Sequence, residues 1–491
     1  MTEHTRSESA DLLSENFSPL SRGLFTEPIM HEDAMIQFKQ SLRGRLIDRA
    51  DSSYEEARQL YNAMIDKRPL MIAQCADVAD VVAAVGFARE QDLRVAVRGD
   101  GHNGPGFGSV DDGLMIDLST MKGVRVDPAN STVRVEAGCT SGEVDHATHA
   151  YGLAVPFGIV STTGVAGLTL GGGIGYLSRK YGLTIDNLLE ADVVLADGSI
   201  VTASPSHNAD LYWGLRGGGG NFGIVTSFLF RAHPVKMVFA GPVFWDIKHA
   251  RTIMRAYRDF LPGAPEDLGI FVGLKTVLPV EPFPAEHRGK QACALVACYT
   301  GSAADGAALM QRLLNELPEP LFNWMSEIPH PALQSMFDPF LPKGMQWYWR
   351  GDFVNELSDE AIDAHIAQAR QTPSPLSLMH LYPINGAVHR LGKSDMAWNT
   401  RGATWAMVIA GIDTNPQNAG NISRWTKRYW EAVHPHSNGG GYVNFMMDDE
   451  DDSRLRATYG DNYDRLVALK GKYDPANFFS VNQNIRPMKN G

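Results

Sequence analysis

Residues 97–108 read VRGDGHNGPGFG, and this glycine-rich stretch decides the fold class. It follows a run with strand character and contains a GxGxxG pattern between Gly99 and Gly104. In a nicotinamide-type dinucleotide fold, a helix must begin at this point so that its N-terminus can hold a pyrophosphate. Here Pro105 and further glycines follow at once, and no helical periodicity appears before Asp117. The pattern therefore excludes a Rossmann turn and predicts an open loop.

Such a loop presents backbone amide groups that can surround an anion, because glycine permits positive φ and leaves no side chain in the way. His102 stands in the middle of the loop. A histidine there can cap the loop through a hydrogen bond, or it can take part in the chemistry of a bound group. The residues of this segment alone leave both interpretations open.

Two further segments are also rich in glycine. Residues 161–175 read STTGVAGLTLGGGIG, and residues 216–225 read RGGGGNFGIV. Small hydroxyl residues and glycines suit an extended polyphosphate or a ring edge that lies against the backbone. A tight crossing of strand and helix would explain only the end of the first segment, and no GxxxxGK[ST] P-loop occurs. Three such loops predict a large dinucleotide lying across one surface.

The composition is that of an ordinary globular protein, with 44% apolar and 20% charged residues. A formal net charge of −12 argues against a nucleic-acid partner, because neutralising phosphates requires a basic face. Residues 1–20 lack the apolar core of a signal peptide, and no run reaches the ~18 apolar residues of a membrane span. The four cysteines lack CxxC spacing, and Cys75, Cys293 and Cys298 lie in apolar runs typical of buried thiols. We therefore expect a cytoplasmic protein without nucleic-acid or membrane partners.

Changes in composition and in the periodicity of apolar residues along the chain predict its domain organisation. Residues 1–45 have the character of an N-terminal arm, and residues 46–237 combine a βαβ beginning with short strands and glycine-rich turns. Over residues 238–440, amphipathic helices alternate with strands, which is typical of an antiparallel sheet covered by helices on one face. Residues 441–491 contain one helix and then a turn. The sequence thus predicts an α+β fold with a binding domain and a substrate-binding domain.

Several short motifs occur in an order that is specific to one type of flavoprotein. They are Arg68-Pro69, residues 97–103, RKYGLT at 179–184, Asp186-Asn187, Ile224, GGYVNF at 440–445, KYDP at 472–475 and NQNI at 482–485. Together they resemble the FAD-binding flavoproteins of the vanillyl-alcohol-oxidase type, and within them the berberine-bridge-enzyme branch with its bacterial 6-hydroxynicotine oxidases. The resemblance covers about residues 61–235 and 377–487.

This resemblance implies a two-lobed FAD-binding domain of the vanillyl-alcohol-oxidase or PCMH type, to which the segment 441–491 returns. It also implies that FAD is bound by the three glycine-rich segments and the C-terminal motif. The implied cofactor-binding residues are Arg98, Gly99, Asp100, Gly101, His102, Asn103, Ser161, Thr162, Thr163, Gly164, Gly167, Leu168, Gly172, Gly173, Gly223, Ile224, Asn482 and Asn484.

The sequence departs from the family pattern at two positions. His102 matches the histidine through which the family links its flavin. Bicovalent members carry a cysteine four residues before the glycine that corresponds to Gly164, but Val160 stands there, so we expect one covalent link, through His102. The family usually has glycine where Asp100 stands. We expect this carboxylate to point away from the pyrophosphate or to be neutralised by Arg98.

Oxidation of an alcohol or amine by a flavin requires a base that removes the proton from the heteroatom while a hydride leaves the carbon. In the family the base tends to be a tyrosine or a carboxylate from the sheet of the substrate domain. The matching residues are Tyr442, which we expect to be the base, and Tyr382 as the second candidate. Arg401 and His389 are candidates to lower the pKa of such a tyrosine, which is normally near ~10. The alternative is that both tyrosines only pack in the sheet.

The run QWYWRGDF, residues 346–353, alternates like a strand. It would direct either Trp347 and Trp349 or Tyr348 and Arg350 toward a pocket, although aromatic strands also occur in cores. The residues expected to line the substrate pocket are Trp347, Trp349 and His389.

The predicted activity is that of an FAD-dependent oxidase, which takes a hydride from a small alcohol, sugar or amine and is reoxidised by O₂. In the family, the side chain before the glycine that corresponds to Gly164 controls the access of oxygen, and Thr163 is smaller than the blocking leucine of some members. A dehydrogenase with another electron acceptor is the main alternative, and a non-catalytic flavin-binding protein is the second. The same flavin domain serves many substrates, so the substrate stays open. We expect a monomer or homodimer without a metal.

Overall fold

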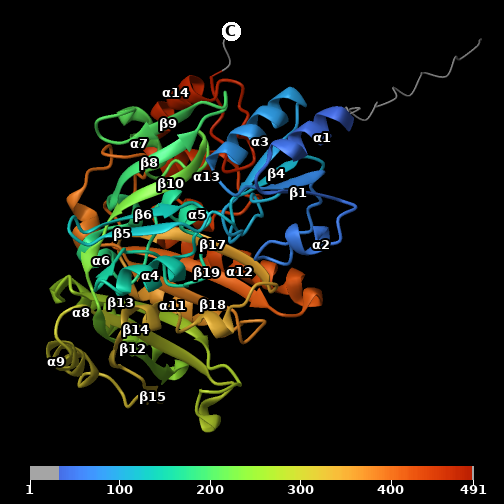
Figure 1. Ribbon diagram of the computed structural model, residues 1–491. Helices are drawn as coiled ribbons and strands as arrows, with labels where there is room; N and C mark the ends of the chain where they lie inside the picture. Colours follow the sequence, from blue (N-terminus) through green and yellow to red (C-terminus); the bar gives the residue numbers. More distant parts are fainter. Residues whose placement is uncertain (1–31, 489–491) are drawn as a thin grey trace, which may run out of the picture.

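The structure is a computed structural model that describes residues 32–488. It has two halves, which lie one above the other in Figure 1. The upper half contains three small sheets and is called the glycine-loop half (residues 32–236 and 441–488). The lower half is built on one eight-stranded sheet and is called the sheet half (residues 237–440). The red C-terminal helices lie with the blue and cyan N-terminal segments in the upper half.

The first sheet of the glycine-loop half has the order β1-β2-β4-β3. Strands β2, β4 and β3 are parallel, and β1 is antiparallel to β2. The helix α3 begins after Asp77, whose side chain caps the first turn by accepting from two backbone N–H groups. The bounds are β1 (Arg45–Asp48), β2 (Met71–Gln74), α3 (Val78–Glu90), β3 (Val95–Arg98) and β4 (Leu114–Asp117).

Part of the expected N-terminal arm is packed into this layer. Helix α1 (Glu32–Ser41) lies on α3, where the rings of Phe38 and Phe87 stack at 4.2 Å, and β1 then pairs with β2. Residues 1–31 lie outside the described part of the chain. A single short helix carries too few apolar residues for its docking site to be recognised from periodicity, which is why the sequence did not reveal this contact.

A five-stranded antiparallel sheet with the order β5-β6-β10-β8-β9 forms the second layer of the glycine-loop half. A short two-stranded sheet of β7 and β11 lies beside it. The strands are β5 (Val124–Asp127), β6 (Thr132–Glu136), β7 (Leu153–Ala154), β8 (Leu188–Val194), β9 (Ile200–Ala203), β10 (Ile224–Arg231) and β11 (His233–Pro234). The helices are α2 (Tyr54–Ala57), α4 (Ser141–His149), α5 (Val165–Leu170), α6 (Ser178–Tyr181) and α7 (Ala209–Leu215).

The large antiparallel sheet has the order β15-β12-β14-β13-β18-β19-β17, with β16 paired to β12. Its strands are β12 (Met237–Asp246), β13 (Leu268–Thr276), β14 (Gln291–Tyr299), β15 (Phe322–Asn323), β16 (Ser326–Pro329), β17 (Gln346–Val354), β18 (Leu378–Pro383) and β19 (Trp405–Asp413). The helices of this half are α8 (Ala250–Phe260), α9 (Ala303–Leu314), α10 (His330–Gln334), α11 (Asp359–Ala369) and α12 (Ala419–Val433).

The two faces of the large sheet have different partners, because side chains alternate along each strand. Helices α8, α9, α11 and α12 cover one face, with Val272 and Leu274 of β13 in the core between them. The opposite face, called the pocket face, carries Phe271 of the same strand together with Tyr382 and Trp347. The expected α+β fold, with an antiparallel sheet covered by helices on one face, is confirmed.

The C-terminal segment crosses from the large sheet back to the glycine-loop half. It contains a short 3₁₀ turn (Val443–Phe445), α13 (Asp452–Tyr459) and α14 (Tyr463–Tyr473). Met446 and Leu466 share a core with Phe222. The buried Lys470 is paired with Asp474 at 2.7 Å and also donates to backbone carbonyls at 2.7 and 2.9 Å, so its charge is fully compensated.

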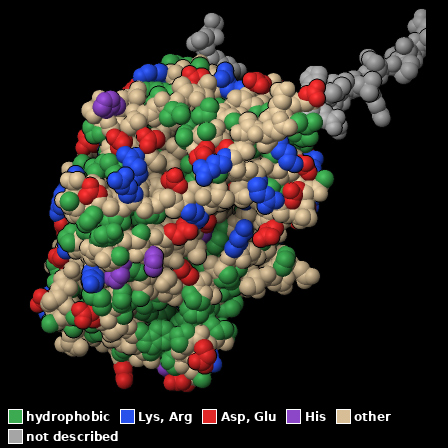
Figure 2. Space-filling model, viewed as in Figure 1, with side chains coloured by type: hydrophobic (Ala, Val, Ile, Leu, Met, Phe, Trp, Pro, Cys, Tyr) green, Lys and Arg blue, Asp and Glu red, His purple; other side chains and the backbone are tan. Residues whose placement is uncertain are grey.

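The surface seen in Figure 2 carries Lys/Arg and Asp/Glu side chains interspersed over its upper part, and hydrophobic side chains gather on its lower part. None of the described helices is long and apolar enough to cross a membrane. Over residues 32–488, no group of three or more His, Cys, Asp or Glu residues has an arrangement that would hold a metal ion. All four cysteines are buried and unpaired, as expected for Cys75, Cys293 and Cys298.

Candidate active site between the glycine loops and the large sheet

A cavity of about 370 Å³ lies between the glycine-rich loops and the pocket face of the large sheet. All three glycine-rich segments contribute to its lining, together with the C-terminal segment. The structure thus brings together loops that are spread over more than a hundred residues of sequence. Of the implied cofactor-binding residues, those that line the cavity are Arg98, Gly99, Asp100, Gly101, His102, Asn103, Thr163, Gly164, Gly167, Leu168, Gly223, Ile224 and Asn482.

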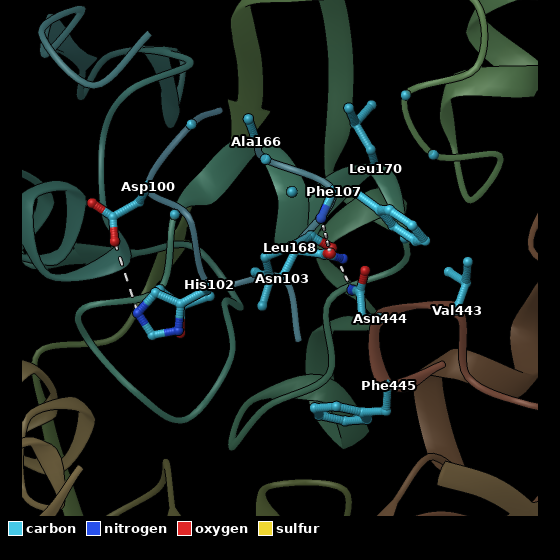
Figure 3. Close-up of a pocket in the computed structure, with 18 of the residues that line it drawn as sticks. Asp100, His102, Asn103, Phe107, Ala166, Leu168, Leu170, Val443, Asn444 and Phe445 are labelled. Carbon is cyan, nitrogen blue, oxygen red and sulfur yellow. Dashed lines mark hydrogen bonds and ion pairs between the residues drawn. The ribbon is translucent and has the colours of Figure 1, made fainter. Parts of the chain in front are cut away.

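His102 lies on the first glycine loop, and Figure 3 shows its ring beside Asp100. The loop follows β3, and Gly101 adopts a φ of +82°, which a residue with a side chain would rarely reach. The Nε2 atom of His102 lies 3.1 Å from the hydroxyl of Thr162 and 3.8 Å from a carboxylate oxygen of Asp100. Its ring stacks on Tyr61 with centroids 3.8 Å apart. Burial lowers the pKa of His102 to about 3, so the imidazole is neutral and keeps a free lone pair.

Arg98 does not neutralise Asp100, contrary to one of the two expectations for that carboxylate. Its Nε and Nη2 atoms donate to Asp117 at 3.0 and 2.7 Å, and Nη1 donates to the carbonyl of Ala57 at 2.6 Å. Both charged partners are buried, and the pair joins the ends of the adjacent parallel strands β3 and β4. Asp100 is left without a close cation, and burial raises its pKa to about 6.

The cradle formed by the loops fits a dinucleotide that lies against the backbone. Gly167 and Gly220 line the cavity, and a Cβ added at either residue would meet no atom within 4 Å. The amide oxygen of Asn482, another lining residue, is buried and has no hydrogen-bond partner among the described residues. Open space over glycine and an unpartnered polar atom at its rim are what a bound FAD would fill.

Some of the implied cofactor residues lie behind the cavity wall and support it. Ser161 donates through its backbone N–H to Asp338 at 3.1 Å, and its hydroxyl bonds the same carboxylate. Gly172 packs against the ring of Tyr442, where a Cβ would approach to 3.2 Å. The implied residues that do not line the cavity are Ser161, Thr162, Gly172, Gly173 and Asn484.

Tyr442 lines the cavity, and its hydroxyl oxygen accepts hydrogen bonds from two N–H donors. Gly173 donates its backbone N–H to this oxygen at 2.9 Å, and the side-chain amide of Asn444 donates at 3.0 Å. The same amide also donates to the carbonyl of Leu168 at 3.1 Å, which fixes its orientation; Figure 3 shows this bond. The ring is 2% exposed. Burial raises the pKa of Tyr442 to about 12, while the Gly173 and Asn444 donors act in the opposite direction.

The base of the family tends to come from the sheet of the substrate domain. Tyr442 instead lies in the C-terminal segment, which was expected to return to the FAD-binding domain, just before a 3₁₀ turn, and it is bound to the second glycine loop. It reaches the cavity from the side of the cofactor loops and not from the sheet.

Tyr382 is the tyrosine that does lie in the sheet, and it also lines the cavity. Its hydroxyl is 2.6 Å from Nε2 of His380, two residues earlier on the same strand. Burial lowers the pKa of His380 to about 3 and raises the pKa of Tyr382 well above its ordinary value. The tyrosine hydroxyl is therefore protonated and shares a hydrogen bond with a neutral imidazole.

The aromatic strand β17 turns its two tryptophans toward the cavity, which resolves the alternative left by the sequence. Trp347 and Trp349 line the cavity with ring centroids 5.7 Å apart, and their indole N–H groups are buried without a partner among the described residues. Tyr348 and Arg350 face the other way and bind Asp449.

Two expected helpers are absent from the cavity. His389 does not line it, because its Nε2 atom is 2.8 Å from the carbonyl of Ala403 in the loop after β18. Arg401 binds Asp186 with both terminal nitrogens, at 2.6 and 2.9 Å, and so it serves as a buried ion pair. The assignments of His389 to the substrate pocket and of both residues as helpers of a tyrosine are corrected accordingly.

Three residues of the site were missed by the sequence analysis. His380 could have been found, because period 2 along residues 378–382 places it on the same face as Tyr382. Asn444 stood in the quoted motif without an assigned role. Tyr61, which stacks on His102, lies in a segment with no recognisable pattern, and only the folded structure brings the two rings together.

Comparisons with known proteins agree with this geometry. The chain matches the model of an FAD binding domain over residues 69–204 and the model "Berberine and berberine like" over residues 441–486. It is 31% identical over 461 residues to an FAD-linked oxidoreductase of Dictyostelium discoideum, an alignment that covers 92% of this chain and 97% of the relative. It is 35% identical over 207 residues to (R)-6-hydroxynicotine oxidase of Paenarthrobacter nicotinovorans, which covers 42% of this chain and 45% of that protein.

The fold is also similar to a solved structure, BBE-like 1 of Physcomitrella patens. The TM-score is 0.83 at 26% identity, over 93% of this chain and 100% of the other. The near-complete alignment with the Dictyostelium relative extends the similarity beyond the cofactor loops to the large sheet. The chain belongs to the FAD-linked oxidoreductases of the berberine-bridge-enzyme type, and it is an FAD-dependent enzyme.

Proposed function

We propose that the protein is an oxidase that takes a hydride from the carbon of a small alcohol, sugar or amine and passes the electrons to O₂. The observation that carries this proposal is Tyr442, which lines the cavity and whose hydroxyl oxygen accepts hydrogen bonds from two N–H donors. Bound FAD supplies the hydride acceptor. A base at the position of Tyr442 would remove the proton from the substrate heteroatom, which is the other half of the reaction.

The chain's own residues can hold and move the substrate proton. The donors Gly173 and Asn444 stabilise the charged form of Tyr442, because hydrogen bonds to a phenolate are strengthened in a buried site. The ionised oxygen accepts the proton of the substrate heteroatom as the hydride leaves the carbon. Tyr382 is the less suitable base, because burial raises its pKa well above the ordinary value and, among the described residues, no backbone or amide N–H donates to its hydroxyl.

We propose further that FAD is attached to the protein by one covalent bond, at His102. The neutral imidazole is held in place by stacking on Tyr61 and by Thr162, and it lines the cavity. Val160 lines the same cavity where bicovalent relatives carry a cysteine, and none of the described cysteines is part of the lining. The four buried, unpaired thiols are consistent with a location in the cytoplasm.

Reoxidation by O₂ is supported by the side chain next to Gly164. Thr163 lines the cavity, and its short side chain leaves more room at that point than a leucine would. A small side chain there favours an oxidase over a dehydrogenase.

Anaerobic mixing with a panel of alcohols, sugars and amines tests the proposal. At least one compound should bleach the flavin absorbance, and air should restore it with formation of H₂O₂. Flavin that is reduced by substrate and reoxidised only by an artificial acceptor would identify a dehydrogenase. A panel that leaves the flavin oxidised, while sodium dithionite reduces it, would contradict the proposed activity.

A further inference from the structure

We propose that Lys275 binds an anionic group of the substrate, a carboxylate, at the end of the cavity far from Tyr442, so that the substrate is an apolar alcohol or amine with a carboxylate at its other end. The identity of the reacting alcohol or amine rests on the proposed function. The anion site itself does not.

Lys275 lies on the pocket face of the large sheet. On β13, Val272 and Leu274 belong to the core under the helices, and Phe271 belongs to the core of the opposite face. Alternation along the strand therefore places Lys275 on the same face as Phe271. Lys275 itself is not part of the cavity lining, but it is paired directly with Leu378 of β18, which lines the cavity, and its charge contributes to lowering the pKa of His380, another lining residue.

The ammonium group of Lys275 has no partner in residues 32–488. It forms no hydrogen bond and no ion pair there, and no carboxylate counteracts the burial that lowers its pKa to about 8. The group is still mostly protonated at neutral pH. Lys470 shows how this chain compensates a buried ammonium elsewhere, with one carboxylate and two carbonyl oxygens. Lys275 is partly exposed, and because no residue of the described chain pairs with it, its ammonium group can take an anion that these residues do not provide.

The surroundings of Lys275 leave room for a ligand. Its other cross-strand neighbour is Ala292 on β14. The next residue of β13 on the pocket face is Gly273, which is paired with Ala294 on one side and with His380 on the other. Gly273, Ala292 and Ala294 have small side chains or none, so they leave open space on this face of the sheet between Lys275 and the cavity.

The cavity between Lys275 and the reacting end is lined mainly by apolar side chains. The lining residues of β18 and β19 at and beside the row of Leu378 are Leu378, Val408, Ala410 and Ile412. On β18, His380 and Tyr382 already bond each other. The unpartnered donors beside these residues are the indole N–H groups of Trp347 and Trp349, which pair across the sheet with Ile412 and Ala410, and two donors are too few to replace the hydration of the several hydroxyl groups of a sugar. The body of the substrate is therefore apolar.

The spacing along β18 sets the length of that body. Tyr382 and Leu378 are four residues apart, which is about 13 Å along a strand. The side chain of Lys275 extends from the position paired with Leu378, so the distance from its ammonium group to Tyr382 is shorter than this. One six-membered ring with a short carboxylate-bearing chain would span it.

Binding of an unreactive pair of probes tests the site without turnover. The probes are 3-(4-methylphenyl)propanoate and the neutral 3-(4-methylphenyl)propanamide, which has nearly the same shape, and binding to the FAD-loaded enzyme is measured by calorimetry. The wild-type enzyme should bind the propanoate at least about tenfold more tightly than the amide, since a desolvated charge pair is stronger than a neutral hydrogen bond.

Substitutions of the lysine give the sharper comparison. Lys275→Met should weaken propanoate binding by about 10–100-fold and leave amide binding unchanged, and Lys275→Arg should retain the preference. Lys290→Met, which removes an exposed lysine from the turn before β14, is the matched control and should have no effect. Lys275→Gln repeats the test if the methionine variant does not fold. Equal binding of the two probes to wild type, or a preference that survives in Lys275→Met, would overturn the proposal.

The hydroxymethyl analogue of the propanoate separates this proposal from the proposed function. If the probes bind through Lys275 but neither this analogue nor any other compound reduces the flavin, the anion site stands and the oxidase proposal fails. If neutral alcohols reduce the flavin and the two probes bind alike, the oxidase proposal stands and the anion site fails.

Discussion

Replacing Tyr442 with phenylalanine keeps the ring and removes the one oxygen to which we assign the substrate proton. General-base catalysis typically contributes ~10²–10⁴-fold to a rate, so anaerobic reduction of the flavin by substrate should slow by about that factor. The ring itself packs against Phe353 and Phe445, with centroid distances of 6.0 and 5.1 Å, and phenylalanine preserves these contacts.

The substitution also has a structural cost that can be worked out from the hydrogen bonds. Asn444 keeps a second acceptor, the carbonyl of Leu168, but the N–H of Gly173 loses the side-chain acceptor that it has in the wild type. An unsatisfied buried N–H costs about 1–3 kcal/mol, and the free energy of unfolding should fall by about that amount. Because Gly173 belongs to the second glycine loop, FAD content must be measured as well. This hydrogen bond couples Tyr442 to the second glycine loop.

The pH dependence of the reaction separates the two roles of Tyr442. With a pKa raised to about 12, the ionised form is a minor species that grows about tenfold per pH unit below that value. The reduction rate of the wild-type enzyme should therefore rise with pH between about 6 and 9. The phenylalanine variant should lose this rise, whereas a residue that only packs would leave it in place.

Rapid mixing under anaerobic conditions measures the reduction rate directly, and Tyr382→Phe is the matched control. If Tyr442→Phe reduces its flavin within a few-fold of wild type and with the same pH dependence, Tyr442 is not the base. A large loss in Tyr382→Phe would then assign the proton to the Tyr382–His380 pair.

Three further outcomes are expected. Acid precipitation should leave the flavin on wild-type protein, with the adduct on the tryptic peptide that contains His102, and His102→Ala should release all of its FAD; free FAD from the wild type would disprove the link. Thr163→Leu should slow reoxidation by O₂ at least about tenfold with little change in the reduction rate, and unchanged reoxidation would remove Thr163 as the oxygen gate. Asp145 of α4, whose carboxylate has no hydrogen-bond partner among the described residues and lies 4.0 Å from His330, has its pKa raised by burial to about 8. Between about pH 4 and 8 the folded state holds a proton that the unfolded state has lost, so stability falls as pH rises through this window. Asp145→Asn should therefore unfold at a higher temperature than wild type at pH 8, with a smaller difference at pH 5, and equal melting temperatures at pH 8 would contradict the burial argument.

The sequence by itself determined the fold class and the place of the cofactor loops. Glycine and proline at 104–108 exclude a helix after β3 for local steric reasons, and these act whatever the rest of the chain does. The order of the motifs was enough to identify the flavoprotein type. Period 2 along 346–353 likewise fixed β17 as a strand with Trp347 and Trp349 on one face.

Tertiary structure alone decided which face of that strand meets the cavity. Alternation defines two faces, but the choice between them depends on what packs against each, and here Asp449 of the C-terminal segment binds Tyr348 and Arg350 from outside. Arg401 was assigned wrongly for the same reason, because its partner Asp186 lies 215 residues away. Pairing across such distances is set by how the sheets and loops pack together, and no local pattern records it.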